Sequence, residues 1–196
     1  MRELSLHLLD LAQNSLAAGA TRLRIEVRLD TATDRLSLTL EDDGRGIPAR
    51  MLEKVTDPFV TSRKTRRVGL GLALLKAAAQ RAEGDLTIVS HEGQGTRVTA
   101  TFRAGHLDRA PLGDLAGTIV SLLACNPHLE LELVATWDGG TFNFSTAAWR
   151  ETQGGGSGLD TAVFAVLHRH LATGLAPLRA AEEAAMGPSR RDGAHA

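Results

Sequence analysis

The sequence lacks a second cysteine, an excess of charge of either sign and any long apolar run. With Cys125 alone the chain cannot form an internal disulfide, which is typical of a reducing compartment, and the apolar run around it predicts a buried side chain. The 22 Lys and Arg against 23 Asp and Glu argue against a surface that coats nucleic acid. No apolar run approaches the roughly 20 residues of a membrane span. We therefore expect a cytoplasmic protein with neither nucleic acid nor membrane as a partner.

Length and apolar spacing predict two units. The 196 residues can hold one domain of ordinary size and a smaller one. Apolar residues recur at helical spacing over residues 2–18, whereas residues 23–29 and 36–40 alternate as half-buried strands do. The other elements expected within residues 1–104 are helices over 48–55 and 69–82 and strands over 86–90 and 96–102. This order predicts the α+β class, a two-layer α/β sandwich with helices on one face of a mixed sheet.

Residues 105–186 are expected to form a separate, small α/β domain of unknown role. Its predicted elements are a helix over 115–124, a hairpin of strands over 129–137 and 141–145, and an amphipathic helix over 159–171. Residues 153–158 predict a mobile loop, and residues 187–196 a disordered tail.

A carboxylate and two glycines follow directly on the strand expected at 36–40. Asp42, at the strand end, can accept a hydrogen bond from the exocyclic amine of an adenine. Gly44 and Gly46 allow the backbone to close over a flat base. The alternative is a solvated Asp-Asp-Gly turn. Spacing excludes a calcium loop, because no glutamate stands where the twelve-residue loop needs its last ligand.

Asp10 and Asn14 are four residues apart and share one face of the first predicted helix. The side-chain oxygen of Asn14 is a hard, neutral ligand suited to a Mg2+ ion held mainly by phosphates and water. Asp10, one turn earlier, could act as a general base toward a water or an incoming hydroxyl. Polar residues on the exposed stripe of an amphipathic helix are the ordinary alternative.

The third motif is Gly69-Leu70-Gly71-Leu72, at the start of a predicted helix. Glycines there expose backbone amides to a phosphate, whose charge the helix dipole favours. The basic residues 63–67, which include Lys64, could fold over a triphosphate. The alternatives are a helix that simply begins with glycine and a solvated or nucleic-acid-binding basic run. A Walker loop is excluded, since no Gly-Lys-Ser/Thr follows.

Taken in the order in which they follow along the chain, these motifs resemble those of the GHKL ATPases, the superfamily of gyrase, heat-shock chaperones, histidine kinases and MutL-type repair proteins. Asn14 matches the asparagine of their N box, and residues 42–46 match their Asp-x-Gly-x-Gly box. Residues 57–59 match the box before the lid, residues 69–72 the second glycine box, and residues 93–96 the closing Gly-x-Gly-Thr. Together the matches cover about residues 5–103.

The resemblance implies a Bergerat-type fold that binds ATP and Mg2+. It places Asp42 and Thr96 at the adenine, Asn14 at the magnesium ion, and Gly69 and Gly71 at the phosphates. The other residues expected to contact ATP are Gly44, Gly46, Lys64, Leu70 and Leu72.

Departures from the resemblance bear on mechanism. Only 13 residues precede Asn14, whereas histidine kinases usually carry a phosphoacceptor region there, so we expect no self-phosphorylation of the usual kind. His7 is not favoured as an acceptor, because it would lie beside the pocket. Asp10 occupies the place of the general-base glutamate of the hydrolytic members, with a side chain one methylene shorter.

From residue 57 onward the pattern looks like histidine kinases and stand-alone anti-sigma serine kinases, with a weaker likeness to regulators linked with iron hydrogenase systems. We therefore expect a stand-alone signalling kinase that transfers the γ-phosphate of ATP to a partner protein. Its C-terminal region would serve in docking or homodimerisation. The alternative is a nucleotide-gated interaction module that hydrolyses ATP slowly, with Asp10 as general base.

Overall fold

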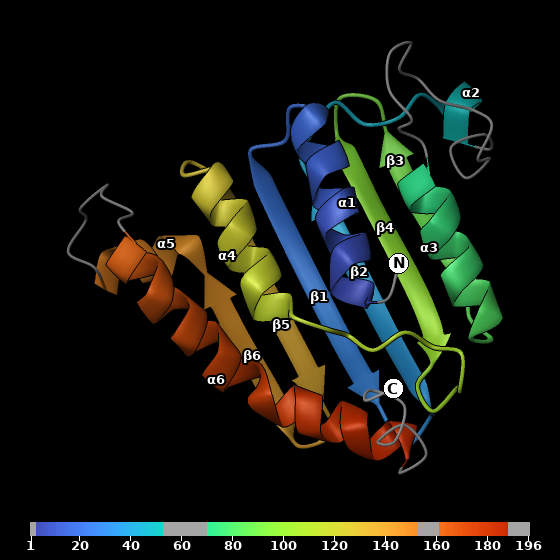
Figure 1. Ribbon diagram of the computed structural model, residues 1–196. Helices are drawn as coiled ribbons and strands as arrows, with labels where there is room; N and C mark the ends of the chain where they lie inside the picture. The colour runs from blue at the N-terminus through green and yellow to red at the C-terminus, as the bar shows by residue number, and fades with distance from the viewer. Residues whose placement is uncertain (1–2, 53–69, 153–160, 188–196) are drawn as a thin grey trace.

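The computed structural model describes residues 3–52, 70–152 and 161–187 (Figure 1). In chain order its elements are α1 (Leu4–Ala17), β1 (Arg22–Asp30), β2 (Arg35–Asp42), α2 (Ala49–Leu52), α3 (Leu70–Arg81), β3 (Leu86–His91), β4 (Gly95–Arg103), α4 (Leu115–Cys125), β5 (Glu130–Trp137), β6 (Gly140–Ser145), α5 (Thr146–Thr152) and α6 (Thr161–Met186). The element order expected for the first 104 residues is confirmed. The loop expected at 153–158 and the tail expected at 187–196, except for Gly187, lie outside the described residues.

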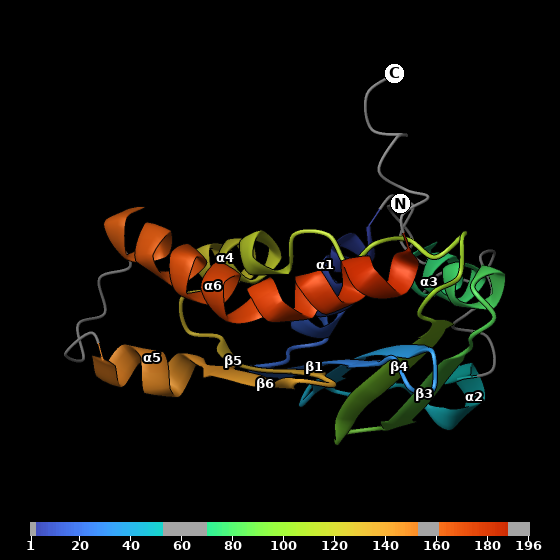
Figure 2. The same cartoon turned by 90° about the horizontal axis from the view of Figure 1, so that it is seen from below.

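The strands form one mixed sheet in the order β3-β4-β2-β1-β5-β6. Neighbouring strands are antiparallel except β1 and β5, which run parallel. Helices α1, α3, α4 and α6 lie across one face of the sheet (Figure 1), and the view from below shows them as a layer on one side (Figure 2). This arrangement confirms the predicted two-layer sandwich.

Alternation along β1 decides which side chains form the core. Its odd-numbered apolar residues are buried under the helices, while Arg24 and Arg28 are exposed. Arg24 pairs with Glu132 of β5 at 3.1 Å, an exposed contact of the kind that contributes little to stability. In the described residues, the apolar face of β1 therefore lies beneath the helices and its charged residues lie on the opposite face.

β5 and β6 extend the sheet of the first 104 residues instead of forming one of their own. Ile25 of β1 pairs with Leu133 of β5, and both side chains are buried in a single hydrophobic core. The boundary predicted at residue 104 is therefore not a boundary of the sheet or of that core.

α6 is longer than predicted, since it continues past residue 171 to Met186 and contains Pro177. Its buried face repeats every three or four residues through Leu167, Leu171, Leu175 and Leu178. α6 passes very close to β6 at Gly174. A β-carbon at this position would lie 2.1 Å from the Phe142 ring, so only glycine fits there.

Two further expectations need correction at this end of the chain. Residues 146–152 form the short helix α5, which apolar spacing did not predict. Cys125 is exposed, not buried, because the buried stripe of α4 runs through Ile119, Leu122 and Leu123 and leaves position 125 on the outer side.

We expect the chain to unfold in one transition. Trp137 and Trp149, the chain's two tryptophans, both lie in the C-terminal part, so fluorescence reports on that part while circular dichroism reports on the whole. Leu133→Ala should lower the free energy of unfolding by about 2 to 5 kcal/mol, with both signals shifting together in urea.

The matched control is Val134→Ala on the opposite face of β5, which should cost less than about 1 kcal/mol. A fluorescence transition that separates from the circular dichroism transition would contradict a shared core.

Candidate nucleotide-binding site

The carboxylate of Asp42 is buried at the end of β2 and held by three donors. The residue is 8% exposed. Its Oδ1 accepts hydrogen bonds from the backbone amides of Gly44 at 2.9 Å and Thr96 at 3.2 Å. Its Oδ2 accepts one from the hydroxyl of Ser15 on α1. Because a carboxylate has about four acceptor positions, this one is fixed in orientation yet able to accept a further donor.

Gly46 and Gly95 let two turns approach each other beside Asp42. Both have positive φ, +68° and +92°. A β-carbon would lie 2.1 Å from the carbonyl oxygen of His91 at Gly46, and 1.9 Å from that of Asp42 at Gly95. Any side chain at either position would therefore force the turns apart.

Ser90, on β3, is a site residue that the motifs did not reveal. Its buried hydroxyl accepts from the amide of Ile47 at 2.8 Å and lies 2.9 Å from both the carbonyl oxygen of Gly95 and the hydroxyl of Thr96. It therefore links the turn after Asp42 to the start of β4. A serine on the inward face of a strand, next to two glycine motifs, is the signal that could have identified it.

Asp10 and Asn14 meet the start of α3. A β-carbon on Gly71 would lie 3.5 Å from Oδ2 of Asp10 and 3.8 Å from Nδ2 of Asn14. The N-terminal turn of α3 therefore lies against the polar stripe of α1. The side chain of Asn14 is exposed, so its amide oxygen is accessible and fits a Mg2+ ion that takes its remaining ligands from phosphates and water.

The pKa values of the two titratable side chains on this stripe, Asp10 and His7, are shifted in opposite directions. Burial raises the pKa of Asp10, which makes its carboxylate a stronger proton acceptor. Burial, assisted by the positive charge of Arg81, lowers the pKa of His7 to about 4, so its imidazole is neutral at pH 7. His7 is only 3% exposed, which argues against its presenting a nitrogen to a phosphate in line.

Asp43 fixes the turn between α1 and β1. Its Oδ1 accepts from the backbone amides of Thr21 at 2.8 Å and Arg22 at 2.9 Å, and its Oδ2 accepts from the Thr21 hydroxyl. Burial opposes ionisation, but these hydrogen bonds outweigh it and lower the pKa of Asp43 to about 2. Asp43 therefore has a structural role, in contrast to the role expected of its neighbour Asp42.

Two of the remaining predicted site residues, Leu70 and Leu72, belong to α3. Leu72 packs against the hydrophobic core. Leu70 begins α3. Lys64 and Gly69 lie outside the described residues, as does the motif at 57–59.

A buried carboxylate between glycine turns, a polar helix stripe against a second helix start, and a two-layer sandwich together define an ATP-binding domain of the Bergerat type. A family model described as "Histidine kinase-, DNA gyrase B-, and HSP90-like ATPase" matches residues 2–106, slightly more than half of the chain. The chain belongs to this family, and its matched part is an ATP-binding, histidine kinase-like domain.

Several relatives are named as sensor kinases. A putative sensor histidine kinase NtrY-like protein of Rickettsia conorii is 30% identical over 108 residues, 55% of this chain and 18% of that protein. The non-motile and phage-resistance protein of Caulobacter vibrioides is 34% identical over 111 residues, 52% of this chain and 13% of that protein. The sensor protein kinase WalK of Staphylococcus haemolyticus is 32% identical over 95 residues, which are 46% of this chain and 16% of that protein. The chain thus spans less than a fifth of the length of these relatives.

Among solved structures, the N-terminal domain of a DNA repair protein matches with a TM-score of 0.49 at 15% identity, over 74% of this chain and 53% of that chain.

In the part of the chain that the structure describes, no helix combines the length and the apolar character needed to cross a membrane.

We expect the contribution of Asp43 to stability to depend on pH. Its folded pKa of about 2 lies below its ordinary 3.8, so the stabilisation is present above pH 3.8 and is lost as the pH falls through 2. Asp43→Asn should cost about 1 to 2 kcal/mol at pH 6, and most of the difference from the parent should be gone at pH 2. Urea unfolding across this range measures it.

Glu92→Gln, an exposed acid in the turn between β3 and β4, is the control and should show no such trend. A cost of Asp43→Asn that stayed constant from pH 6 to pH 2 would contradict the hydrogen-bonding account.

Proposed function

We propose that the protein is a signalling kinase that transfers the γ-phosphoryl group of ATP to a side chain of a partner protein. The observation that carries this proposal is the proximity of Asp10 and Asn14, on one side-chain stripe of α1, to Gly71, while Asp42 contacts the same helix through Ser15. This arrangement provides separate groups for the base and for the phosphates of one nucleotide. The names of the sensor kinase relatives support phosphoryl transfer in preference to other uses of ATP.

Each part of the site has a role in this proposal. Asp42 and Thr96 bind the adenine, Asn14 supplies a ligand to Mg2+, and the amides of Gly69 and Gly71 bind the phosphates. The acceptor atom of the partner bonds to the γ-phosphorus as the bond to the β,γ-bridging oxygen breaks. ADP leaves, and the proton of the acceptor passes to Asp10.

A second candidate function is slow ATP hydrolysis that gates an interaction. Asp10 would serve this candidate as well, because a carboxylate with a raised pKa beside Gly71 can also deprotonate an attacking water. The two candidates differ only in the acceptor, a protein side chain or water.

Incubation with γ-labelled ATP in the presence of captured partner proteins should distinguish protein phosphorylation from ATP hydrolysis. We expect the label on a partner protein, and phosphopeptide mapping then identifies its acceptor residue. Asp10→Asn should slow transfer by about 100-fold while ADP affinity changes by less than threefold. Label found only in free phosphate, in amounts that Asp10→Asn abolishes, would favour the hydrolytic switch.

Binding of the adenine can be tested separately from phosphoryl transfer. Asp42→Asn should weaken ADP binding by at least tenfold in titration calorimetry, because the buried acceptor loses its charge. Its neighbour Glu41, which pairs with Arg97 on the open face of the sheet, provides the control Glu41→Gln, which should bind ADP as the parent does. Equal affinities of Asp42→Asn and parent would show that the adenine lies elsewhere.

The metal role of Asn14 makes a separate prediction. Asn14→Ala should remove most of the dependence of ATP binding on Mg2+, because the ion loses its protein ligand. Affinity measured with and without EDTA gives the comparison. If the variant gains as much affinity from Mg2+ as the parent, Asn14 is not a ligand.

A further inference from the structure

Arg109 is a fully buried arginine in the segment between β4 and α4, outside the nucleotide motifs. It is 0% exposed. Its Nε donates to the carbonyl oxygen of Ala104 at 2.7 Å, and its Nη1 donates to that of Ala110 at 3.0 Å and to Oε1 of Glu182 at 2.7 Å. Its Nη2 is buried without a hydrogen-bond partner. A charge buried this deeply persists only if a partner such as Glu182 neutralises it.

Glu182 extends the buried face of α6 and holds the same segment twice. The residue is 4% exposed, and its Oε1 accepts from the backbone amide of Leu112 at 2.8 Å as well as from Arg109. We call residues 104–114 the strap. The last turns of α6 therefore fix the middle of the strap through one carboxylate.

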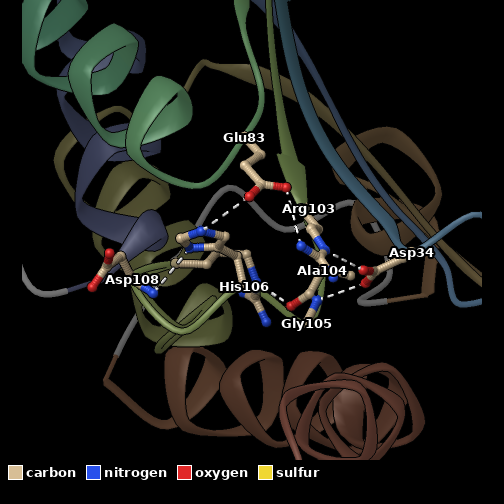
Figure 3. Close-up of polar contacts among 8 residues, drawn as sticks. Asp34, Glu83, Arg103, Ala104, Gly105, His106 and Asp108 are labelled. Carbon is tan, nitrogen blue, oxygen red and sulfur yellow. Dashed lines mark hydrogen bonds and ion pairs between the residues drawn. The ribbon is translucent and has the colours of Figure 1, made fainter.

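The start of the strap is fixed to the turn between β1 and β2 (Figure 3). The carboxylate of Asp34 accepts from the amide of Gly105 at 2.7 Å and from Nε of Arg103 at 2.8 Å. The Arg103 hydrogen bond, followed by that from Gly105, lowers the pKa of Asp34. Glu83, at the end of α3, pairs with the other side of Arg103 at 3.1 Å.

The end of the strap holds the first turn of α1. The amides of Leu4 and Ser5 donate to the carbonyl oxygens of Pro111 and Leu112, at 2.9 Å and 2.8 Å. The residue before α1, Glu3, makes no side-chain cap. The strap therefore provides acceptors for helix amides that would otherwise lack them.

α1 carries this contact directly to the nucleotide site. At 1.5 Å per residue, Asp10 lies about 9 Å and Asn14 about 15 Å along the helix axis from Leu4. A helix moves as a rigid rod over this length, so a shift of its first turn displaces both side chains relative to Gly71.

We infer that Arg109 and Glu182 are positioning residues for the nucleotide site. Together they hold the strap, the strap holds the first turn of α1, and α1 presents Asp10 and Asn14 to the nucleotide. This assigns a role to residues 105–186, and it rests on nucleotide binding by α1, not on the identity of the phosphate acceptor.

The test uses the full chain and the variant Glu182→Gln, which keeps an oxygen for the Leu112 amide but removes the charge opposite Arg109. We expect hydrogen exchange in the first turn of α1 to accelerate at least tenfold and the affinity for Mg2+·ADP to fall about tenfold. In the parent, Mg2+·ADP should slow exchange at the Leu112 amide, because coupling between two sites is reciprocal. Glu132→Gln, which breaks the exposed pair with Arg24, is the control and should change neither.

A double variant, Arg109→Met with Glu182→Leu, separates positioning from stability. Apolar replacements can restore the stability that a buried ion pair provides, but they cannot accept from Leu112. We expect the melting temperature to recover while the affinity for Mg2+·ADP stays low. An affinity that recovers together with the melting temperature would overturn the inference and leave the pair a purely structural role.

Two further outcomes separate this inference from the proposed function. If the parent binds Mg2+·ADP and Glu182→Gln binds it equally well, the inference fails and the function stands. If the parent binds no nucleotide, the proposed function fails. Exchange in the first turn of α1 still decides the mechanical link, because an unchanged rate in Glu182→Gln would overturn it.

Discussion

The parallel pairing of β1 with β5 is the constraint on which the rest of this structure depends. β1 is covered by β2 on one edge, and only β5 covers the other. Once β5 is in place, α4 and α6 cover the added part of the sheet, and the strap must cross beside the start of α1. The C-terminal region is thus a continuation of the nucleotide domain, joined to it by backbone hydrogen bonds and a common core.

α1 is where the separate requirements of the protein meet. The Ser15 hydroxyl of this helix donates to Asp42, and its polar stripe lies against Gly71. Its first turn is held by the strap. One helix of 14 residues therefore contacts the end of β2, the start of α3 and the segment that leads into the C-terminal region.

Local patterns predicted what is local. Alternation predicted the strands because the described helices α1, α3, α4 and α6 lie on one face of the sheet. The spacing of acids and glycines singled out Asp42, which is buried at the end of β2, and Asn14, which lies beside Gly71. The partner of β5 could not be predicted, because the same alternation suits an isolated hairpin. Nor could the pair of Arg109 and Glu182, which are 73 residues apart and each resemble an ordinary surface charge. Ser90 was missed because a lone serine carries no motif.

The parallel pairing of β1 with β5 also constrains the order in which the parts of the sheet can fold. Arg24 and Glu132, neighbours across β1 and β5, are separated by 108 residues. Contacts this distant in sequence form late, since the entropy of closing the loop must be overcome before they contribute. While the chain emerges from the ribosome, the second edge of β1 therefore waits uncovered until β5 has been made. Every second residue of β1 is charged (Arg22, Arg24, Glu26, Arg28 and Asp30), and charged side chains on an uncovered strand hinder its pairing with a strand of another chain.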